Sequence, residues 1–292
     1  MPLSTGMTLS GSLTGIVNDI RTRSYKLMVA EGVCKKLVTP VGVGQKGNKV
    51  TIPFWDPTSR NGTSGTEGNE FTNFTSYNSA TREYTSAEWI EGTKLSYNDF
   101  EDSSESVRDE HARMHGIVHG KKIEKKITAC FASFTTNAIV ATSAAGLTIQ
   151  KLAAAKALLE GQVNSFGGDP ALVLNSNVWY RLAVGLTNNV NYGVLGTLGD
   201  KVLDKYYQGR VLDVPVYITK TGISTVGTGT TVSCGLFYKD AIGMFMPRDF
   251  TLKQEESVAL RGYKIVSSHR MGARVHLEKA GVKILTLGSA PA

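Results

Sequence analysis

The hydrophobic residues Val50, Ile52 and Phe54 stand at every second position of residues 49–55, KVTIPFW. Successive side chains of a β-strand point to opposite faces, so this stretch predicts a strand. A second strand-like stretch, residues 83–97, follows residues 56–80, which contain no valine, isoleucine, leucine or methionine. A segment without aliphatic side chains cannot supply a core element. The pattern therefore predicts an extended hairpin with a long polar tip.

The polar segment 56–80 keeps three aromatic residues, Phe71, Phe74 and Tyr77, at a spacing of three. Because the segment has no core of its own, these rings need a surface elsewhere. We expect them to contact another subunit, with Arg60 as a fourth contact candidate. Exposure to solvent is the alternative.

A long helix is predicted over residues 99–134, where charge is sorted along the chain. Residues 99–110 hold six acids and one base, and residues 111–126 hold five bases and one acid. Acids near the start of a helix and bases near its end both complement the helix dipole. The residues expected on the apolar face of this helix are Val107, Met114 and Val118, followed by Ile123, Ile127 and Phe131.

Helices and strands alternate from residue 148 to about residue 245, which is typical of a compact α/β unit. Residues 148–163 predict an amphipathic helix with Thr148 as its N-cap. Further elements are predicted at residues 171–174 (strand), 176–184 (helix), 195–207 (helix) and 211–219 (strand). The end of the chain is predicted to be rich in strands, at residues 232–246, 250–255, 259–268, 272–277 and 282–286.

Composition adds further constraints. Of 292 residues, 31 are glycine, above the usual share of about 7%, which favours turns and strands. Basic residues exceed acidic ones by 32 to 25, and the net charge of +7 favours contact with polyanions. The three cysteines, Cys34, Cys130 and Cys234, have no paired spacing and argue against a disulfide framework. No apolar run approaches the roughly 18 residues of a membrane span.

The first 15 residues are rich in glycine, serine and threonine and nearly without charge. They lack the basic start and apolar stretch of a signal peptide. Such a segment cannot bury enough apolar area to order itself. We expect it to pack against its own domain or against a neighbouring subunit.

Catalytic motifs are missing from the sequence. The G-x-S-x-G, P-loop and H-E-x-x-H patterns do not occur, and the glycine-rich residues 41–47 lack the GK[ST] of a phosphate loop. The cysteines have no local histidine partner, and Cys130 is expected to be buried rather than reactive. We therefore predict no catalytic residue, no cofactor site and no metal site, and we expect that the chain is not an enzyme.

Histidines mark two places along the chain. His111, His115 and His119 recur at i, i+4 and i+8 on one helical face, a spacing that could surround a metal, but no acid completes the set. We expect a solvated or subunit-facing stripe, with a pH-sensitive contact as the sharper alternative. His269 and His276 lie in the last strands beside arginines, and we expect ordinary surface positions there, with phosphate-facing positions as the alternative.

The order of elements resembles that of the major capsid proteins of tailed bacteriophages, which have the Hong Kong 97-type fold. The closing segment, ALRGYKIVSSHRMGARV followed by EKAGVKIL, is similar to the ends of several such proteins. The resemblance covers essentially the whole chain and implies an α+β fold. Its implied parts are an N-terminal arm (1–44), an extended β-hairpin loop (45–98), a spine helix with peripheral domain (99–147), an α/β axial domain (148–245) and peripheral-domain strands (246–292).

The resemblance also implies a structural role. Many copies of the chain would assemble, as pentamers and hexamers, into an icosahedral head that encloses double-stranded DNA. The expected location is the virion, after assembly in the cytoplasm of a bacterial host. The implied partners are a scaffolding protein, a portal, a decoration protein and packaged DNA contacted without sequence specificity, and no membrane is implied.

Two features depart from some members of that family. Some cross-link covalently through a lysine near the loop tip, but residues 56–81 contain no lysine, so we expect no cross-links. Some carry a long N-terminal scaffolding segment that is later cleaved. Here only about 45 residues precede the first clear strand, so we expect a separate scaffolding protein.

Three other functions fit parts of the sequence. An encapsulin-type nanocompartment shell protein would share the same fold. An α/β enzyme could use residues 56–80 as a lid, but the sequence lacks a grouped base, nucleophile and orienting residue. A DNA-binding protein would gather its basic residues in one region, whereas here they are spread along the chain.

Overall fold

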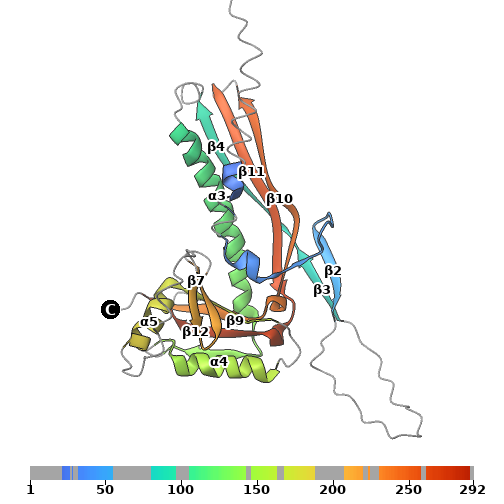
Figure 1. The fold of residues 1–292 in the computed structure, drawn as a ribbon. Helices are drawn as coiled ribbons and strands as arrows, with labels where there is room; N and C mark the ends of the chain where they lie inside the picture. Colours follow the sequence, from blue (N-terminus) through green and yellow to red (C-terminus); the bar gives the residue numbers. More distant parts are fainter. Residues whose placement is uncertain are drawn as a thin grey trace, which may run out of the picture.

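The structure is a computed structural model in which two β-sheets are joined by one long helix (Figure 1). It describes residues 22–26, 28, 32–54, 80–96, 105–142, 146–162, 168–187, 207–219, 223, 230–257 and 261–289. The first sheet has four strands in the order β1-β10-β11-β4, and the second has six in the order β5-β12-β9-β6-β8-β7. Strands β2 and β3 form a separate two-stranded hairpin.

The four-stranded sheet is built on two long strands. These strands, β10 (Ile242–Ser257) and β11 (Gly262–Val275), pair antiparallel, and β4 (Ala87–Ser96) continues the sheet antiparallel to β11. The short β1 (Thr39–Val41) adds a parallel edge to β10. Helix α3 (Glu105–Thr128) lies along the sheet against β11 and β4 (Figure 1). Its 24 residues span about 36 Å at 1.5 Å per residue.

The six-stranded sheet has mixed strand directions and two helices. Its strands are β5 (Ala138–Ala141), β12 (Gly281–Leu287), β9 (Thr231–Phe237), β6 (Ala171–Asn175), β8 (Val214–Thr219) and β7 (Tyr207–Val211). Helix α4 (Ile149–Gln162) contacts β5, β9 and β12, and helix α5 (Ser176–Thr187) contacts β6 and β8. Strand β6 is buried along most of its length, as expected for a central strand.

The main hydrophobic core joins the end of α3 to the six-stranded sheet. After α3 the chain tightens into the 3₁₀ helix η3 (Ala129–Ser133), where Phe131 is fully buried, and Phe134 follows it at the same depth. Two glycines let these rings approach the strands, because a Cβ at Gly235 or Gly281 would lie 2.7 or 2.4 Å from a ring atom. The close contact fixes how the long helix meets the second sheet.

The predicted hairpin is confirmed, but its second strand is shorter than expected. Strand β2 (Lys49–Phe54) pairs antiparallel with β3 (Ala80–Thr85). The predicted strand 83–97 divides at Ser86, whose backbone N–H donates to the Asn48 carbonyl at 2.8 Å. Beyond this residue the chain leaves the hairpin and enters the four-stranded sheet as β4. No glycine or proline marks the division, so the sequence pattern runs through it.

Helix α4 begins directly after its predicted cap, because the Thr148 hydroxyl accepts a hydrogen bond from the Lys151 N–H at 3.4 Å. Another boundary differs from the expectation. The predicted strand 211–219 is broken by a turn at Leu212 and Asp213, which have positive φ angles of 53° and 64°. A two-residue turn of this kind usually carries asparagine or glycine, so no residue in the sequence marks this turn. The predicted helix 195–207 falls almost entirely outside the described residues.

The closing strands do not all belong to one sheet. We expected residues 246–292 to complete the peripheral sheet, and β10 and β11 do so. Strand β12, however, pairs with β9 and β5 in the six-stranded sheet. The short 3₁₀ helix η7 (Glu278–Ala280) turns the chain from one sheet to the other. Residues 281–287 alternate between buried and half-buried positions, a pattern that either sheet could accept.

Candidate assembly elements and buried polar clusters

The contact residues expected from the sequence lie in the hairpin tip. Arg60, Phe71, Phe74 and Tyr77 all fall outside the described residues, so their contacts stay a prediction. The structure does describe the base of the hairpin, which consists of strands β2 and β3.

Tyr84 anchors the hairpin base in the four-stranded sheet. Its ring is 1% exposed and packs with Val50 and Phe245. Its hydroxyl lies 2.6 Å from the Nδ1 atom of His276, and burial raises the pKa of Tyr84 to about 12. The phenol is therefore neutral at physiological pH and serves as a hydrogen-bonding group. His276, expected at an ordinary surface position, is instead half-buried at this anchor.

Polar contacts fasten the outer side of the same base. Lys49 and Glu83 form an ion pair of 2.8 Å across the two strands. The Arg270 guanidinium donates to the Asn48 side-chain oxygen at 3.0 Å, and Arg274 donates to the Glu83 carbonyl at 3.1 Å. Exposed ion pairs add little stability. These contacts tie the hairpin to β11 and hold its orientation.

The histidines of α3 are not the solvated stripe that we expected. His115 and His119 are 0 and 1% exposed, while Met114, expected on the apolar face, is 44% exposed. The helix therefore turns its histidines toward β11 and β4. Gly116 and Gly120 are buried on the same side of the helix, where their small size permits close packing on the sheet.

A continuous chain of hydrogen bonds joins α3 to the sheet through these histidines. Ser267 in β11 lies 2.7 Å from both the Nδ1 atom of His115 and the Nε2 atom of His119. The Nδ1 atoms of His119 and His269 are 2.6 Å apart. At the other end, Thr93 in β4 lies 3.0 Å from His115 Nε2. The chain ends at the Nδ1 atom of His111, 3.3 Å from the Thr93 hydroxyl.

One arrangement of protons gives every buried donor in this chain an acceptor. Within the described residues, His269 Nε2 has no hydrogen-bond partner, so a proton there would be buried and unpaired. The favoured tautomer of His269 carries its proton on Nδ1 and donates to His119, which in turn donates from Nε2 to Ser267. The Ser267 hydroxyl then donates to His115, and His115 Nε2–H donates to Thr93.

Burial keeps the three innermost imidazoles neutral. It lowers the pKa of His115, His119 and His269 to about 4 in each case, with neighbouring histidines adding to the effect for His115 and His269. His269, which we also expected at the surface, is 0% exposed. Each ring nitrogen of His115 and His119 is engaged in a hydrogen bond, so the cluster has the character of a structural contact.

Glu124 is a buried residue that the sequence analysis missed. It is 1% exposed in the second half of α3, and its carboxylate accepts a hydrogen bond from the Cys34 backbone N–H at 3.1 Å. Cys34 begins the 3₁₀ helix η1 (Cys34–Leu37). Burial raises the pKa of Glu124, and hydrogen bonds to its charged form oppose that rise. The contact attaches the segment that precedes β1 to the long helix.

The face of the four-stranded sheet opposite α3 exposes apolar side chains. Ile90 in β4 and Val266 in β11 are 64 and 39% exposed. Ile90 pairs with Ser268 and Gly92 pairs with Val266, so the two side chains are diagonal neighbours on one face. Arg248 and Glu88 form an ion pair beside them. This outer sheet face is a second candidate contact surface, besides the hairpin tip.

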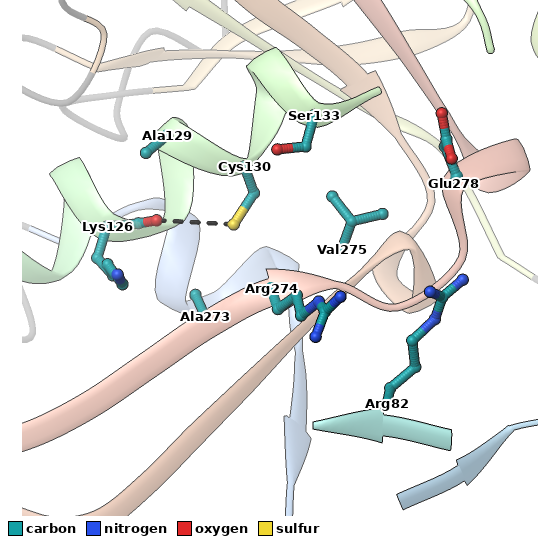
Figure 2. A pocket seen from close by; sticks show the side chains of 9 residues that line it. All are labelled: Arg82, Lys126, Ala129, Cys130, Ser133, Ala273, Arg274, Val275 and Glu278. Carbon is teal, nitrogen blue, oxygen red and sulfur yellow. Dashed lines mark hydrogen bonds between the residues drawn. The ribbon is translucent and has the colours of Figure 1, made fainter. Parts of the chain in front are cut away.

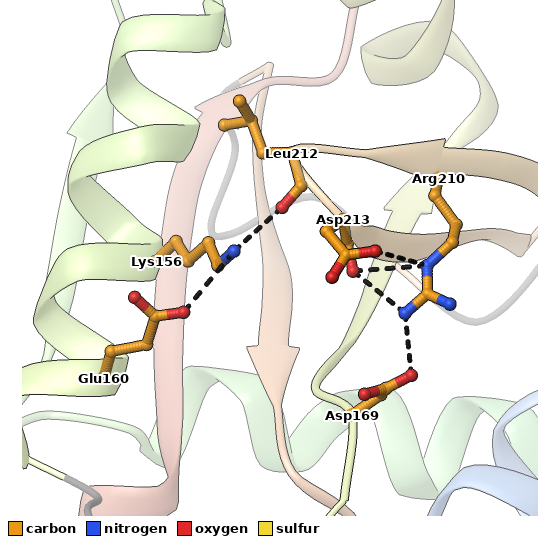
Figure 3. A network of polar contacts seen from close by, with 6 residues as sticks. All are labelled: Lys156, Glu160, Asp169, Arg210, Leu212 and Asp213. Carbon is orange, nitrogen blue, oxygen red and sulfur yellow. Dashed lines mark hydrogen bonds and ion pairs between the residues drawn. The ribbon is translucent and has the colours of Figure 1, made fainter.

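Charged side chains hold the unusual turn between β7 and β8 (Figure 3). Lys156 in α4 donates to the Leu212 carbonyl at 2.9 Å and pairs with Glu160 at 3.4 Å. Arg210 pairs with Asp169 at 2.7 Å, and it also donates to the Asp213 carbonyl at 3.1 Å. These contacts bind the positive-φ turn to the neighbouring helix and loop.

The described thiols lack the exposure and the lowered pKa of reactive cysteines. All three cysteines are buried and reduced. Burial raises the pKa of Cys130 to about 11, that of Cys234 to about 12 and that of Cys34 well above its ordinary value, so the thiols stay protonated. Within the described ranges there is no group of three metal-type ligands and no helix long and apolar enough to cross a membrane.

Comparison with known proteins places the fold. No protein-family model and no curated protein sequence matches the chain. Among solved structures, the capsid of the cyanophage P-SCSP1u is 15% identical with a TM-score of 0.66, over 88% of this chain and 89% of that one. The capsid of Ralstonia phage GP4 is 10% identical with a TM-score of 0.62, over 88% of both chains.

A third similar structure is a virus-like particle from Pyrococcus furiosus. It is 11% identical with a TM-score of 0.58, over 91% of this chain and 98% of that one. At such low identity the shared property is the fold, which extends over nearly the whole length of each chain. The chain has the Hong Kong 97-type fold that the resemblance of its sequence to that family implied.

Proposed function

We propose that this chain is the major capsid protein of a tailed bacteriophage. Many copies would assemble, as pentamers and hexamers, into an icosahedral shell around double-stranded DNA. The observation that carries the proposal is the extent of the fold similarity, which covers 87–88% of this chain and 86–89% of the capsid chains of the cyanophage, Ralstonia phage GP4 and bacteriophage PhiM1. Similarity over a whole chain argues for a whole-chain function, here the formation of a shell.

The architecture supports a structural role rather than catalysis. The long helix and two sheets form a body, and the hairpin β2–β3 leaves that body with a 25-residue connection between Phe54 and Ala80. Such a connection gains little by packing on its own chain, because residues 56–80 lack aliphatic side chains. A neighbouring copy would supply the surface that Arg60, Phe71, Phe74 and Tyr77 need.

The remaining assignments follow from the same role. Residues 1–44 would be the arm, 45–98 the extended loop and 99–147 the spine with its peripheral domain. The axial domain would comprise residues 148–245, joined by β12. The virion would be the final location, after assembly in the bacterial cytoplasm. A scaffolding protein, a portal and a decoration protein are the proposed partners, and the net charge of +7 is compatible with enclosed DNA.

Electron microscopy of particles purified from cells that express this chain tests the proposed function. The chain is co-expressed with any scaffolding protein whose gene lies beside its own. Closed shells of uniform size are the expected result. Replacement of Phe71, Phe74 and Tyr77 by serine is expected to prevent closure while circular dichroism stays that of the wild type. The matched control replaces Thr72, Thr75 and Asn78 of the same loop by alanine and is expected to assemble. Assembly of the serine variant would overturn the contact assignment, and absence of any wild-type particle would overturn the shell function.

A nanocompartment shell is the second candidate, favoured by the similarity to the Pyrococcus furiosus particle. The two functions differ in contents. Native phage heads would contain a long double-stranded DNA that resists nuclease, whereas a nanocompartment would contain a protein cargo. Genes for a portal and a terminase beside this one would favour the phage, and a gene for a cargo enzyme would favour the nanocompartment.

A further inference from the structure

A cavity of about 370 Å³ lies where the end of α3, the hairpin base and the 3₁₀ helix η7 meet (Figure 2). Strand β11 forms its floor, and η7 closes one side. The cavity is lined by Arg82, Lys126, Ala129, Cys130, Ser133, Ala273, Arg274, Val275 and Glu278. Neither the buried histidine chain nor the proposed loop contacts use these side chains.

The cavity has an excess of positive charge. Arg82 comes from β3, Lys126 from α3 and Arg274 from β11, so three cations reach it from three different elements. Glu278 is the only acid among the lining residues. Three positive charges and one negative charge leave the site with a formal charge of +2 at pH 7.

The single carboxylate of the cavity already accepts hydrogen bonds from the 135–136 turn. Glu278 Oε1 accepts hydrogen bonds from the backbone N–H groups of Thr135 and Thr136 at 2.9 and 2.8 Å, and from both hydroxyls. These bonds outweigh partial burial and lower the pKa of Glu278 to about 2. Glu278 therefore stays charged and caps the 135–136 turn.

Within the described residues, neither Lys126 nor Arg274 forms an ion pair. The Arg274 guanidinium donates a hydrogen bond to the neutral backbone carbonyl of Glu83 at 3.1 Å. Their potential reaches neighbouring groups. Arg82 and Arg274 lower the pKa of Tyr84 against the larger rise caused by burial, and Arg82 lowers that of His276.

We propose that this cavity binds a small phosphate-type oxyanion held by Arg82, Lys126 and Arg274. A phosphate carries a charge of about −1.5 to −2 at pH 7, which compensates most of the excess charge of the site. Its oxygens also point in several directions, so donors from three different elements can each reach one. Guanidinium groups bind phosphate oxygens through paired hydrogen bonds. A single carboxylate would leave one positive charge uncompensated.

The bound anion would add one more link between three parts of the molecule. It would connect the hairpin base, the spine helix and β11 at the point where η7 leads into the other sheet. Free inorganic phosphate and the terminal phosphate of a nucleotide share this chemistry. The cavity volume of about 370 Å³ accommodates either a phosphate with water or the phosphate end of a larger molecule.

Titration of the purified full chain in phosphate-free buffer tests the site. Sodium phosphate at millimolar concentration is expected to give saturable binding by calorimetry and a saturable rise in Tm, with sodium chloride at equal ionic strength giving neither. Acetate is expected to bind at least about tenfold more weakly, because it brings half the charge. Adenosine 5′-monophosphate and adenosine form the second pair of probes. If the nucleotide binds more tightly than phosphate, the site binds the terminal phosphate of a nucleotide. If it binds equally or more weakly, the ligand is free inorganic phosphate.

Variants separate this site from general charge effects. Lys126→Gln and Arg274→Gln are each expected to weaken phosphate binding about tenfold, and Arg274→Lys to restore part of it. Lys125→Gln is the matched control, because Lys125 is an exposed neighbour on α3 that does not line the cavity. No saturable phosphate binding by the wild type, or equal loss in the Lys125 control, would overturn the proposal. The wild-type titration decides even if a variant does not fold.

Discussion

His119 in α3 and His269 in β11 meet through their Nδ1 atoms, 2.6 Å apart, although 150 residues separate them in sequence. Their rings cross edge to face at 77°, with centroids 4.7 Å apart, and Phe250 contacts His119 from the next strand. Only one proton fits between the two nitrogens. The two imidazoles therefore cannot both be protonated while they hold this contact, and in the packing of α3 on its sheet burial keeps both of them neutral.

We predict that this packing is acid-sensitive. The pKa of His115, His119 and His269 is about 4 in the folded chain and about 6.5 when unfolded. The unfolded state therefore binds more protons between these values. The stabilisation is complete above about pH 6.5 and is lost as the pH falls toward 4. Each histidine contributes a slope of up to about 1.4 kcal/mol per pH unit.

Urea unfolding at pH 7.0, 6.0 and 5.0 measures how the free energy of unfolding changes with pH. This range lies above the pH at which most carboxylates titrate, so the histidines dominate the change. Other charges act on His269, since Asp249 raises its pKa while Lys35 and Arg248 lower it. The variant His269→Phe removes one titrating group and is expected to flatten the profile. A wild-type free energy of unfolding that stays constant from pH 7 to 5 would contradict the prediction.

Ser267→Ala is predicted to destabilise the chain by about 1–3 kcal/mol. The hydroxyl connects His115 and His119 at 2.7 Å each, and its removal leaves buried imidazole nitrogens without a partner. Ser268→Ala is the matched control on the opposite face of β11, where the side chain is half-buried. Chemical denaturation of both variants should give a clearly larger loss for Ser267. Equal losses would show that the hydrogen-bond chain adds nothing specific.

The burial of these histidines could have been found in the sequence. His115 and His119 continue at the same four-residue spacing into Ile123 and Ile127, which are both buried. We joined Ile123 and Ile127 to Met114 and Val118 instead of to the histidines, because histidine counts as polar in a hydrophobic pattern. In β11 the buried positions 265, 267, 269 and 271 alternate with exposed or half-buried ones, but serine and histidine occupy the middle two.

Other features could not be obtained from local pattern. The division of residues 83–97 at Ser86 and the placement of β12 depend on which strands become neighbours, a property of the whole chain. The hairpin, the long helix and the capped helix α4 follow from local pattern and were predicted. The cavity combines Arg82, Lys126 and Arg274, which are far apart in sequence and carry no shared motif.

Denaturing electrophoresis of assembled particles is expected to show a single band at the mass of the chain, 31.4 kDa. Residues 56–81 contain no lysine that could form a cross-link at the loop tip. The described thiols are buried and protonated, which removes them as alternative linking groups. A ladder of higher bands that survives boiling with a reductant would refute this prediction.

Gly243→Ala is predicted to loosen the hairpin base. A Cβ at this position would lie 2.5 Å from the Tyr84 hydroxyl, so the ring must move away from β10 and its hydrogen bond to His276 must lengthen. Overpacking of this kind costs about 1–3 kcal/mol. Gly92→Ala is the matched control in the same sheet, because the nearest atom to its new Cβ would be 3.9 Å away. If the proposed loop contacts close the shell, Gly243→Ala should reduce the yield of closed particles more than Gly92→Ala does. Equal yields and equal midpoints of unfolding would show that Tyr84 does not orient the loop.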